Sequence, residues 1–448
     1  MIKEMIKTSV TYKEIWKIAY PIILGSIVQN IISVTDTAFL GRVGEIELGA
    51  AAIGGVFYIT LIMLGFGFSI GTQIIVARRF GENRQNEIGE TIEHSHYFLI
   101  VLSIVLIFLM RAFMPFIFEN VLESEEVRIA TNEYLSYRIW GLFFACINFG
   151  FRAFYIGIAR TKVITWTTIF MALTNVFLDY ALIFGNFGFN EYGIAGAAIA
   201  SVVAEIAACA FFIVYTIKFV DLKYYGLFNF RKFSYKLLKR IITVSFPMMM
   251  QNFLSLAGWF FFFLFVEKMG ERPLAVSNIV RSIFVVMLIP IWGFNSATNT
   301  LVSYAIGRER TDEVISIVFK VLKLGIACVI CLITINLIIP EKVLSIYTNN
   351  TTLIQESLPS LRVISIAAIF LTTGFILFSG VSGTGMTKIS FLIETAIIVF
   401  YIALAYVLTN LNNAKIEYVW TVEIFYGTLI GSLSYFYLRF GNLQHKRI

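Results

Sequence analysis

Long apolar stretches separated by short polar segments dominate the sequence. Twelve stretches reach the length of about 20 residues that a helix needs to cross a bilayer. Several are longer, which indicates tilted or kinked helices. The strict alternation typical of a membrane β-barrel is absent, so the pattern predicts an all-α polytopic membrane protein. The predicted spans are residues 15–40, 47–77, 92–112, 128–155, 163–185, 193–219, 239–267, 274–304, 315–339, 356–380, 388–409 and 416–440.

Composition and charge agree with this class. Only 14% of the 448 residues are charged and 58% are hydrophobic, whereas soluble proteins are about 25% charged. The net charge of +7 does not indicate a nucleic-acid partner, because Lys and Arg gather in alternate loops, such as 78–90 and 218–240, and at the termini. Loop 119–127 between them is acidic. By the positive-inside rule, both termini are expected in the cytoplasm, with the bilayer of the cell (inner) membrane around the helices.

The two halves of the chain repeat each other. Pro21 recurs as Pro247, 226 residues later. Six spans per repeat is an even number, so both halves insert in the same sense, and a pseudo-two-fold axis along the membrane normal is expected to relate two six-helix lobes. We assign residues 1–219 to an N-lobe, 220–238 to a cytoplasmic basic linker, and 239–448 to a C-lobe. Other pairs at the same interval are Gly44/Gly270, Gly67/Gly293, Thr72/Thr298, Gly81/Gly307, Glu87/Glu313, Gly157/Gly383, Thr161/Thr387 and Lys162/Lys388.

The first span contains a carboxylate, Asp36, well inside its apolar run. An ionised Asp at the bilayer centre costs roughly 2.5–3.5 kcal/mol even on lenient scales. Ser26, Gln29 and Ser33 precede it at intervals of three and four residues, so all four lie on one helical face. Such a face is expected to line an aqueous cavity. Pro21 removes a backbone hydrogen bond and predicts a hinge in this helix.

A second intramembrane acid, Asp179, lies four residues after Asn175 on one face of the fifth span. The second half of the repeat lacks these polar residues, because the equivalents of Asp36, Asn175 and Asp179 are Phe262, Tyr401 and Ala405. The three polar residues are therefore not needed for the repeated scaffold. We therefore interpret the three polar residues as a coupling-ion site, protonated as a coupled pair of acids or occupied by Na⁺. The alternative is that both acids pair with arginine or backbone in a packed interior.

Weaker signals surround this set. Possible accessory residues are Gln29, Ser33, Ser201 and Glu205. Methionine and aromatic side chains adapt to apolar ligands and attract organic cations, which predicts a substrate cavity in the second half, although most such side chains face lipid in any membrane protein. Glu394 and Glu423 favour helix-packing hydrogen bonds. The residues expected at the cavity are Asn252, Trp259, Phe262, Asn295, Asn299 and Tyr401.

Five segments of the sequence carry a family resemblance: VTDTAFLGRVG, GFGFSIGTQIIVARRFGENR, GIARTK, NVFLDYALIFG and GIAGAAIAS. Together they resemble the MATE (multidrug and toxic compound extrusion) transporters, over essentially the whole chain. The resemblance implies an exporter of small amphipathic or cationic organic compounds by H⁺ or Na⁺ antiport, without a cofactor, and a monomer is expected. The Asp36, Asn175 and Asp179 set is similar to the DinF-like branch. The NorM-like branch has further acids in spans 7 and 10, which this chain lacks at Phe262 and within 371–385.

Other functions remain alternatives. A flippase for lipid-linked precursors would need basic residues in its cavity, and the first-half spans offer Arg138 and Arg152. An enzyme is not expected, because the three histidines show no HExxH-like spacing and the cysteines lie in apolar runs. A channel is disfavoured, since a two-lobed repeat with midspan acids suits alternating access better.

Overall fold

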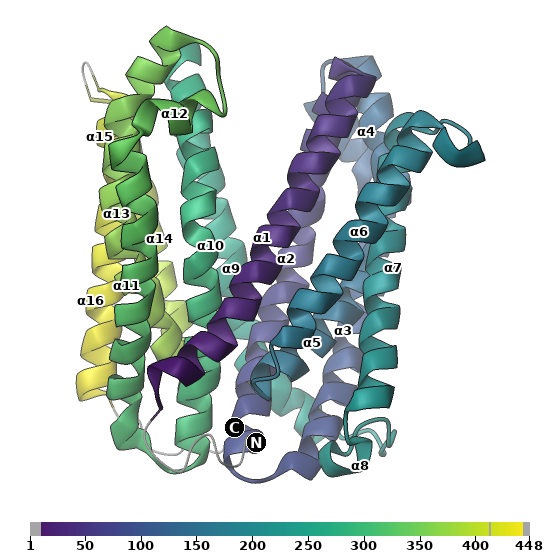
Figure 1. Cartoon of the computed structure of the whole chain (residues 1–448), viewed down its shortest axis with the longest axis vertical. Helices are drawn as coiled ribbons and strands as arrows, with labels where there is room; N and C mark the ends of the chain where they lie inside the picture. The colour runs from purple at the N-terminus through teal and green to yellow at the C-terminus, as the bar shows by residue number, and fades with distance from the viewer. Residues whose placement is uncertain (1–9, 412–413, 442–448) are drawn as a thin grey trace. The chain divides into compact units, whose positions relative to one another are not determined.

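A computed structural model describes residues 10–411 and 414–441, and all regular structure within them is helical (Figure 1). Ten helices are long and apolar enough to cross a membrane, and the bent pair α4–α5 would add an eleventh. The helices are α1 (Tyr12–Val43), α2 (Glu45–Gly81), η1 (Gln85–Glu87), α3 (Ile88–Val121), α4 (Glu125–Arg138), α5 (Gly141–Gly157), α6 (Lys162–Phe184), η2 (Asn186–Gly188), α7 (Gly193–Phe219), α8 (Leu222–Tyr225), α9 (Tyr235–Glu267), α10 (Glu271–Gly307), η3 (Thr311–Glu313), α11 (Val314–Ile338), α12 (Pro340–Ser345), α13 (Thr351–Gly383), α14 (Thr387–Thr409), α15 (Ile416–Trp420) and α16 (Val422–Phe440).

Two predicted spans are not single helices. The span at 128–155 is divided into α4 and α5, which are bent by 47°, and the span at 416–440 is divided into α15 and α16. At both breaks the backbone changes to tighter i→i+3 hydrogen bonds, at Trp140 (3.3 Å to Tyr137 O) and at Thr421 (3.1 Å to Tyr418 O). Hydropathy does not report such changes, because they alter the backbone hydrogen bonds rather than the composition.

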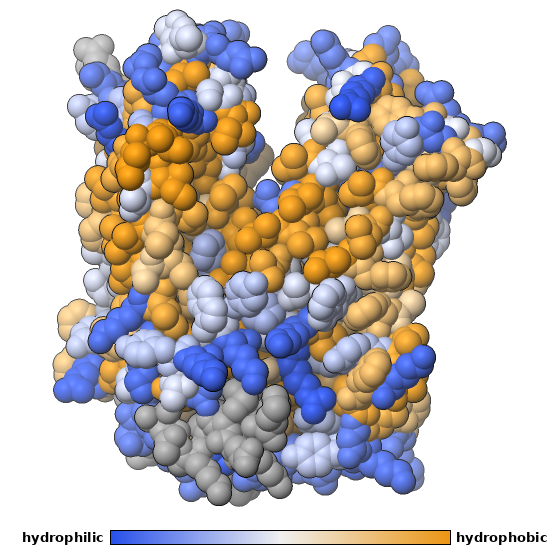
Figure 2. Space-filling model, in the orientation of Figure 1, coloured by the Kyte–Doolittle hydropathy of each residue, from blue (hydrophilic) through white to orange (hydrophobic). Residues whose placement is uncertain are grey.

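The hydropathy of the surface follows the helices. In both units described below, apolar residues (orange) cover the middle of the long helices and polar residues (blue) gather near their ends (Figure 2). Large aromatic side chains such as Phe108 and Phe116 of α3 are exposed. Large exposed apolar surface is costly in water and is expected where lipid covers it. An all-α membrane fold, as predicted, is therefore confirmed.

The chain forms two compact units. Unit 1 contains the described residues up to Ile23 and those from Met250 onward, and unit 2 contains Leu24–Met249. The chain thus changes unit inside α1 and again inside α9, and the two boundaries are 226 residues apart, the interval of the sequence repeat. In Figure 1, α13 lies beside α16 in unit 1, and α6 lies beside α7 in unit 2.

Glycines let α1 and α9 pack closely against α10 and α2 within these units. In unit 2, a Cβ added at Gly67 of α2 would lie 2.7 Å from Met248 O, and one at Gly71 would collide with Ser245 of α9. In unit 1, a Cβ at the equivalent Gly293 of α10 would lie 3.2 Å from Ala19 O of α1 and would collide with Ile23. The repeat therefore conserves a helix crossing that has no room for a side chain.

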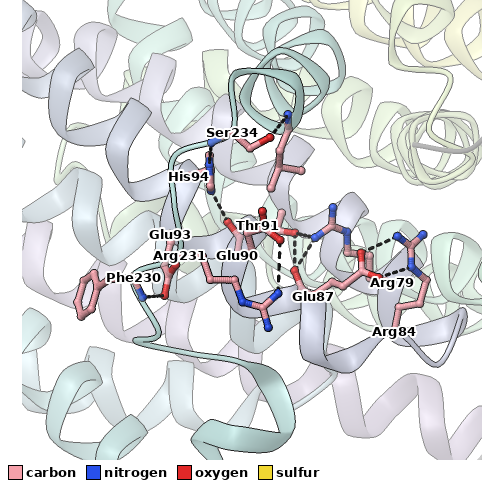
Figure 3. A network of polar contacts seen from close by, with 11 residues as sticks. Arg79, Arg84, Glu87, Glu90, Thr91, Glu93, His94, Phe230, Arg231 and Ser234 are labelled. Atoms are coloured by element: carbon pink, nitrogen blue, oxygen red, sulfur yellow. Dashed lines mark hydrogen bonds and ion pairs between the residues drawn. The ribbon is translucent and has the colours of Figure 1, made fainter.

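The basic linker is part of unit 2, where it contacts α3 (Figure 3). It includes the short helix α8, and α9 begins at Tyr235, four residues before the predicted span. Two backbone N–H groups of the linker donate to side chains of α3. In addition, His94 of α3 stacks on Phe233 of the linker, with ring centroids 5.4 Å apart. The contacts are Phe230 N–H to Glu93 Oε1 (3.0 Å), Ser234 N–H to His94 Nε2 (2.8 Å) and the ion pair of Arg231 with Glu90 (3.8 Å).

Candidate functional site

The predicted coupling-ion residues come together in unit 2, on α1 and α6. Asp179 and Asn175 lie one turn apart on α6 and are 0% and 1% exposed, while Asp36 of α1 is half-buried. The side chains of Asp36 and Asp179 lie close enough to interact electrostatically. Two adjacent carboxylates repel each other.

The protein supplies no donor for most polar atoms of this cluster. Among the described residues, no N–H or O–H group donates to Asp36 Oδ1 or to either carboxyl oxygen of Asp179, and both amide atoms of Asn175 also have no partner. Buried polar groups in proteins are otherwise almost always hydrogen-bonded. Oxygens arranged in this way fit a bound proton or a small monovalent cation such as Na⁺, which would satisfy several of them at once.

A buried ion pair lies next to this cluster. Arg138 donates to both carboxyl oxygens of Glu205 at 2.7 and 3.0 Å, and its guanidinium lies 3.8 Å from the ring centroid of Tyr58. A Cβ added at Gly141, just after the α4–α5 break, would collide with this pair. Arg138 also interacts electrostatically with Asp36. Glu205, predicted as a possible accessory ligand, is thus paired with arginine in this structure.

Sequence reasoning missed the role of Arg138. The available signal was an arginine inside an apolar segment, which is rare and usually functional. Its partner could not be identified from spacing, because Glu205 is 67 residues away on α7.

The other accessory residues of unit 2 lie apart from the buried cluster. Gln29 and Ser33 are exposed on α1, where Ser33 Oγ donates to Gln29 O at 3.5 Å. Ser201 is half-buried on α7, one turn before Glu205. Pro21 is buried in unit 1, and α1 continues through it as one helix. Accessory binding and the hinge remain predictions.

The residues predicted to line a substrate cavity all belong to unit 1 but differ in environment. Phe262 and Tyr401 are 1% and 3% exposed and pack together in its core, with ring centroids 6.1 Å apart. Trp259 stacks on Phe284, with ring centroids 5.8 Å apart. Asn252 is half-buried on α9. Asn295 and Asn299 of α10 have shielded Oδ1 atoms without a donor among the described residues. That these six residues line a cavity therefore stays a prediction.

Comparison with known proteins agrees with this architecture. The MatE family model matches residues 21–181 and again residues 247–407, two copies separated by the 226-residue interval. The chain is 25% identical over 381 residues to a probable multidrug resistance protein NorM of Thermotoga maritima, covering 84% of this chain and 80% of that protein. It is 22% identical over 341 residues to a protein of the same name from Pasteurella multocida, covering 75% and 73% of the two chains.

Solved structures share the fold. An outward-facing multidrug resistance MATE family transporter of the MOP superfamily superposes with a TM-score of 0.89 at 18% identity, covering 97% of both chains. A MOP superfamily transporter from Pyrococcus furiosus gives a TM-score of 0.88 at 19% identity, covering 96% of this chain and 95% of that one. The family model matches this chain twice and covers most of its residues, and the solved structures share its fold. The chain therefore belongs to the MatE (MATE) family of membrane transporters.

Proposed function

We propose that this protein is a secondary active multidrug efflux transporter, which exports amphipathic or cationic organic compounds by H⁺ or Na⁺ antiport with alternating access. The named relatives are multidrug resistance proteins, which supports this substrate class. The observation that carries the coupling is the cluster of Asp36, Asn175 and Asp179, buried together with polar atoms that the protein leaves without donors.

Charge explains why such a cluster couples two fluxes. Two adjacent carboxylates repel, and a proton or Na⁺ between them removes that repulsion. Taking up the ion from outside changes the charge of unit 2 by one, so the loaded and the empty protein favour different packing around Asp179. A transporter that opens outward when loaded, and inward when empty, exchanges the ion for substrate.

Location and assembly follow from the same proposal. We place the protein in the cell (inner) membrane as a multi-pass monomer with both termini in the cytoplasm, on the basis of its loop charges. Whether H⁺ or Na⁺ is the driving ion decides which gradient energises export.

The test is dye transport in inverted membrane vesicles that contain the full chain, with ΔpH and ΔNa⁺ imposed separately over a panel of cationic dyes. We expect one gradient to drive dye accumulation and its collapse to stop it. If Na⁺ raises the melting temperature of the purified protein only when Asp36 is intact, the coupling ion is Na⁺. If Na⁺ has no such effect and ΔpH drives transport, the coupling ion is H⁺. Transport that persists with neither gradient would contradict antiport.

A further inference from the structure

Unit 1 contains a second pair of buried acids, Glu394 of α14 and Glu423 of α16, which are 1% and 3% exposed. Neither acid forms part of the repeated scaffold, because their equivalents one interval earlier are Thr168 and Ala197. Their surroundings differ from those of Glu205, since none of the seven ion pairs among the described residues includes either acid.

Tyrosine hydroxyls donate to both carboxyls. Tyr426 OH donates to Glu394 Oε1 at 2.8 Å, and Tyr401 OH donates to Glu423 Oε1 at 2.9 Å. The two tyrosine rings lie 5.6 Å apart, so they connect the two acids. The groups facing Glu394 are Ser255 of α9 and the titratable Tyr426, with Glu423 also near Tyr426. A buried carboxylate served by neutral donors alone costs several kcal/mol when ionised.

The geometry at Ser255 indicates where a proton resides. Its Oγ lies 2.5 Å from Glu394 Oε1 and 3.0 Å from Gln251 O. One hydroxyl hydrogen cannot serve both acceptors. Both contacts are satisfied if Glu394 carries a proton and donates it to Ser255 Oγ, while Ser255 donates to Gln251 O. Glu394 Oε2 and Gln251 Oε1 remain shielded without a donor among the described residues.

The repeat relates this cluster to the candidate site of unit 2. Tyr401 stands at the position equivalent to Asn175, and Ser255 at the position equivalent to Gln29. Phe262, the equivalent of Asp36, packs against Tyr401. Each unit thus has acids in corresponding regions, but at different positions of the helices.

We propose that Glu394 and Glu423 form a second protonation site, in unit 1, which binds and releases H⁺ as the transporter changes state. The role of this site in transport rests on the proposed function, whereas the binding of a proton by the two acids does not. Opening of the α9–α14–α16 contact admits water and lets the proton leave Glu394. Closing it makes the ionised acid costly and restores the proton.

Infrared difference spectroscopy on the purified full chain tests this directly, because a protonated carboxyl has its own C=O stretching band. Exposed carboxyls, with pKa values of about 4, are ionised throughout pH ~6.5–9, so only buried acids change over that range. We expect a band in the wild-type protein that loses about one carboxyl's intensity in Glu394→Gln and again in Glu423→Gln. Glu341→Gln, an exposed acid on α12, should leave the spectrum unchanged.

Identical pH-difference spectra for the wild type and both variants would overturn the proposal. If the variants do not fold, carboxyl-labelled glutamate in the wild type serves instead: the band must move with the label, and a band that does not move also overturns it. Failure of the proposed function would give a different result from failure of this inference. If the proposed function is wrong, Asp36→Asn and Asp179→Asn leave dye export unchanged, whether or not the carboxyl band depends on Glu394 and Glu423.

Discussion

At the scale of single residues, the acids inside this protein have three kinds of surroundings. Glu205 pairs with an arginine, Glu394 accepts from hydroxyls, and Asp179 lies beside a second acid, Asp36. The sequence alone predicted that Asp36 and Asp179 are unusual, because an acid inside an apolar span needs a reason, and Asn175 followed from helical spacing. The pairing of Glu205 could not be predicted, because it depends on tertiary packing of α4 against α7.

Removing one member of the Arg138–Glu205 pair leaves an uncompensated buried charge. We predict that Glu205→Gln lowers the free energy of unfolding by about 3–5 kcal/mol, measured as thermal unfolding of the purified protein. The double variant with Arg138→Gln should lose less than the sum of the two single variants.

The exposed pair of Arg272 and Glu356 provides the matched control. Both side chains are nearly half exposed, so Glu356→Gln should change stability by less than about 1 kcal/mol. Equal effects of Glu205→Gln and Glu356→Gln would mean that the Arg138–Glu205 pair is solvated rather than buried.

At the scale of elements, most helices agree with the apolar runs. The span predicted at 193–219 matches α7 in full, and α6 and α14 differ from their predicted limits by one residue. The breaks at Trp140 and Thr421 were missed because they change the hydrogen-bond pattern without changing hydropathy. Short helices such as α8 were missed because four residues give no periodicity.

The crossing of α2 with α9 should tolerate no side chain at Gly71. We predict that Gly71→Ala destabilises the protein by about 1–3 kcal/mol, since the new methyl group meets the Ser245 backbone. Gly55→Ala in the same helix meets nothing within 4 Å and should stabilise it slightly, by about 0.5–1 kcal/mol. Thermal unfolding of both variants checks this, and equal melting temperatures would refute the close crossing.

The linker should loosen when its acceptor on α3 is removed. His94→Phe retains stacking on Phe233 but leaves the Ser234 N–H without its partner, which costs about 1–3 kcal/mol. We expect limited proteolysis within 228–234 to become about 5- to 100-fold faster. His96→Phe, whose ring contacts α5 rather than the linker, should cleave at the wild-type rate. Equal rates for the two variants would show that His94 does not hold the linker.

At the scale of the whole molecule, one interval of 226 residues recurs in three observations. It relates repeated residues in the sequence, the two copies of the family model, and the two positions where the chain changes unit. The scaffold is thus duplicated, while the acids inside the spans are not. Function specific to one repeat is therefore expected at positions where the copies differ, and Asp36 against Phe262 is the clearest such difference.

The most direct test of this account is gradient-driven dye export by Asp36→Asn and Asp179→Asn in inverted vesicles. We predict that each variant loses export by at least about tenfold, a loss of about 1.4 kcal/mol or more in coupling, while protein levels and melting temperature are retained. Asp312→Asn, at an exposed acid of η3, is the matched control and should export at the wild-type rate. Wild-type export by both Asp36→Asn and Asp179→Asn would contradict the assignment of these residues as the coupling-ion site.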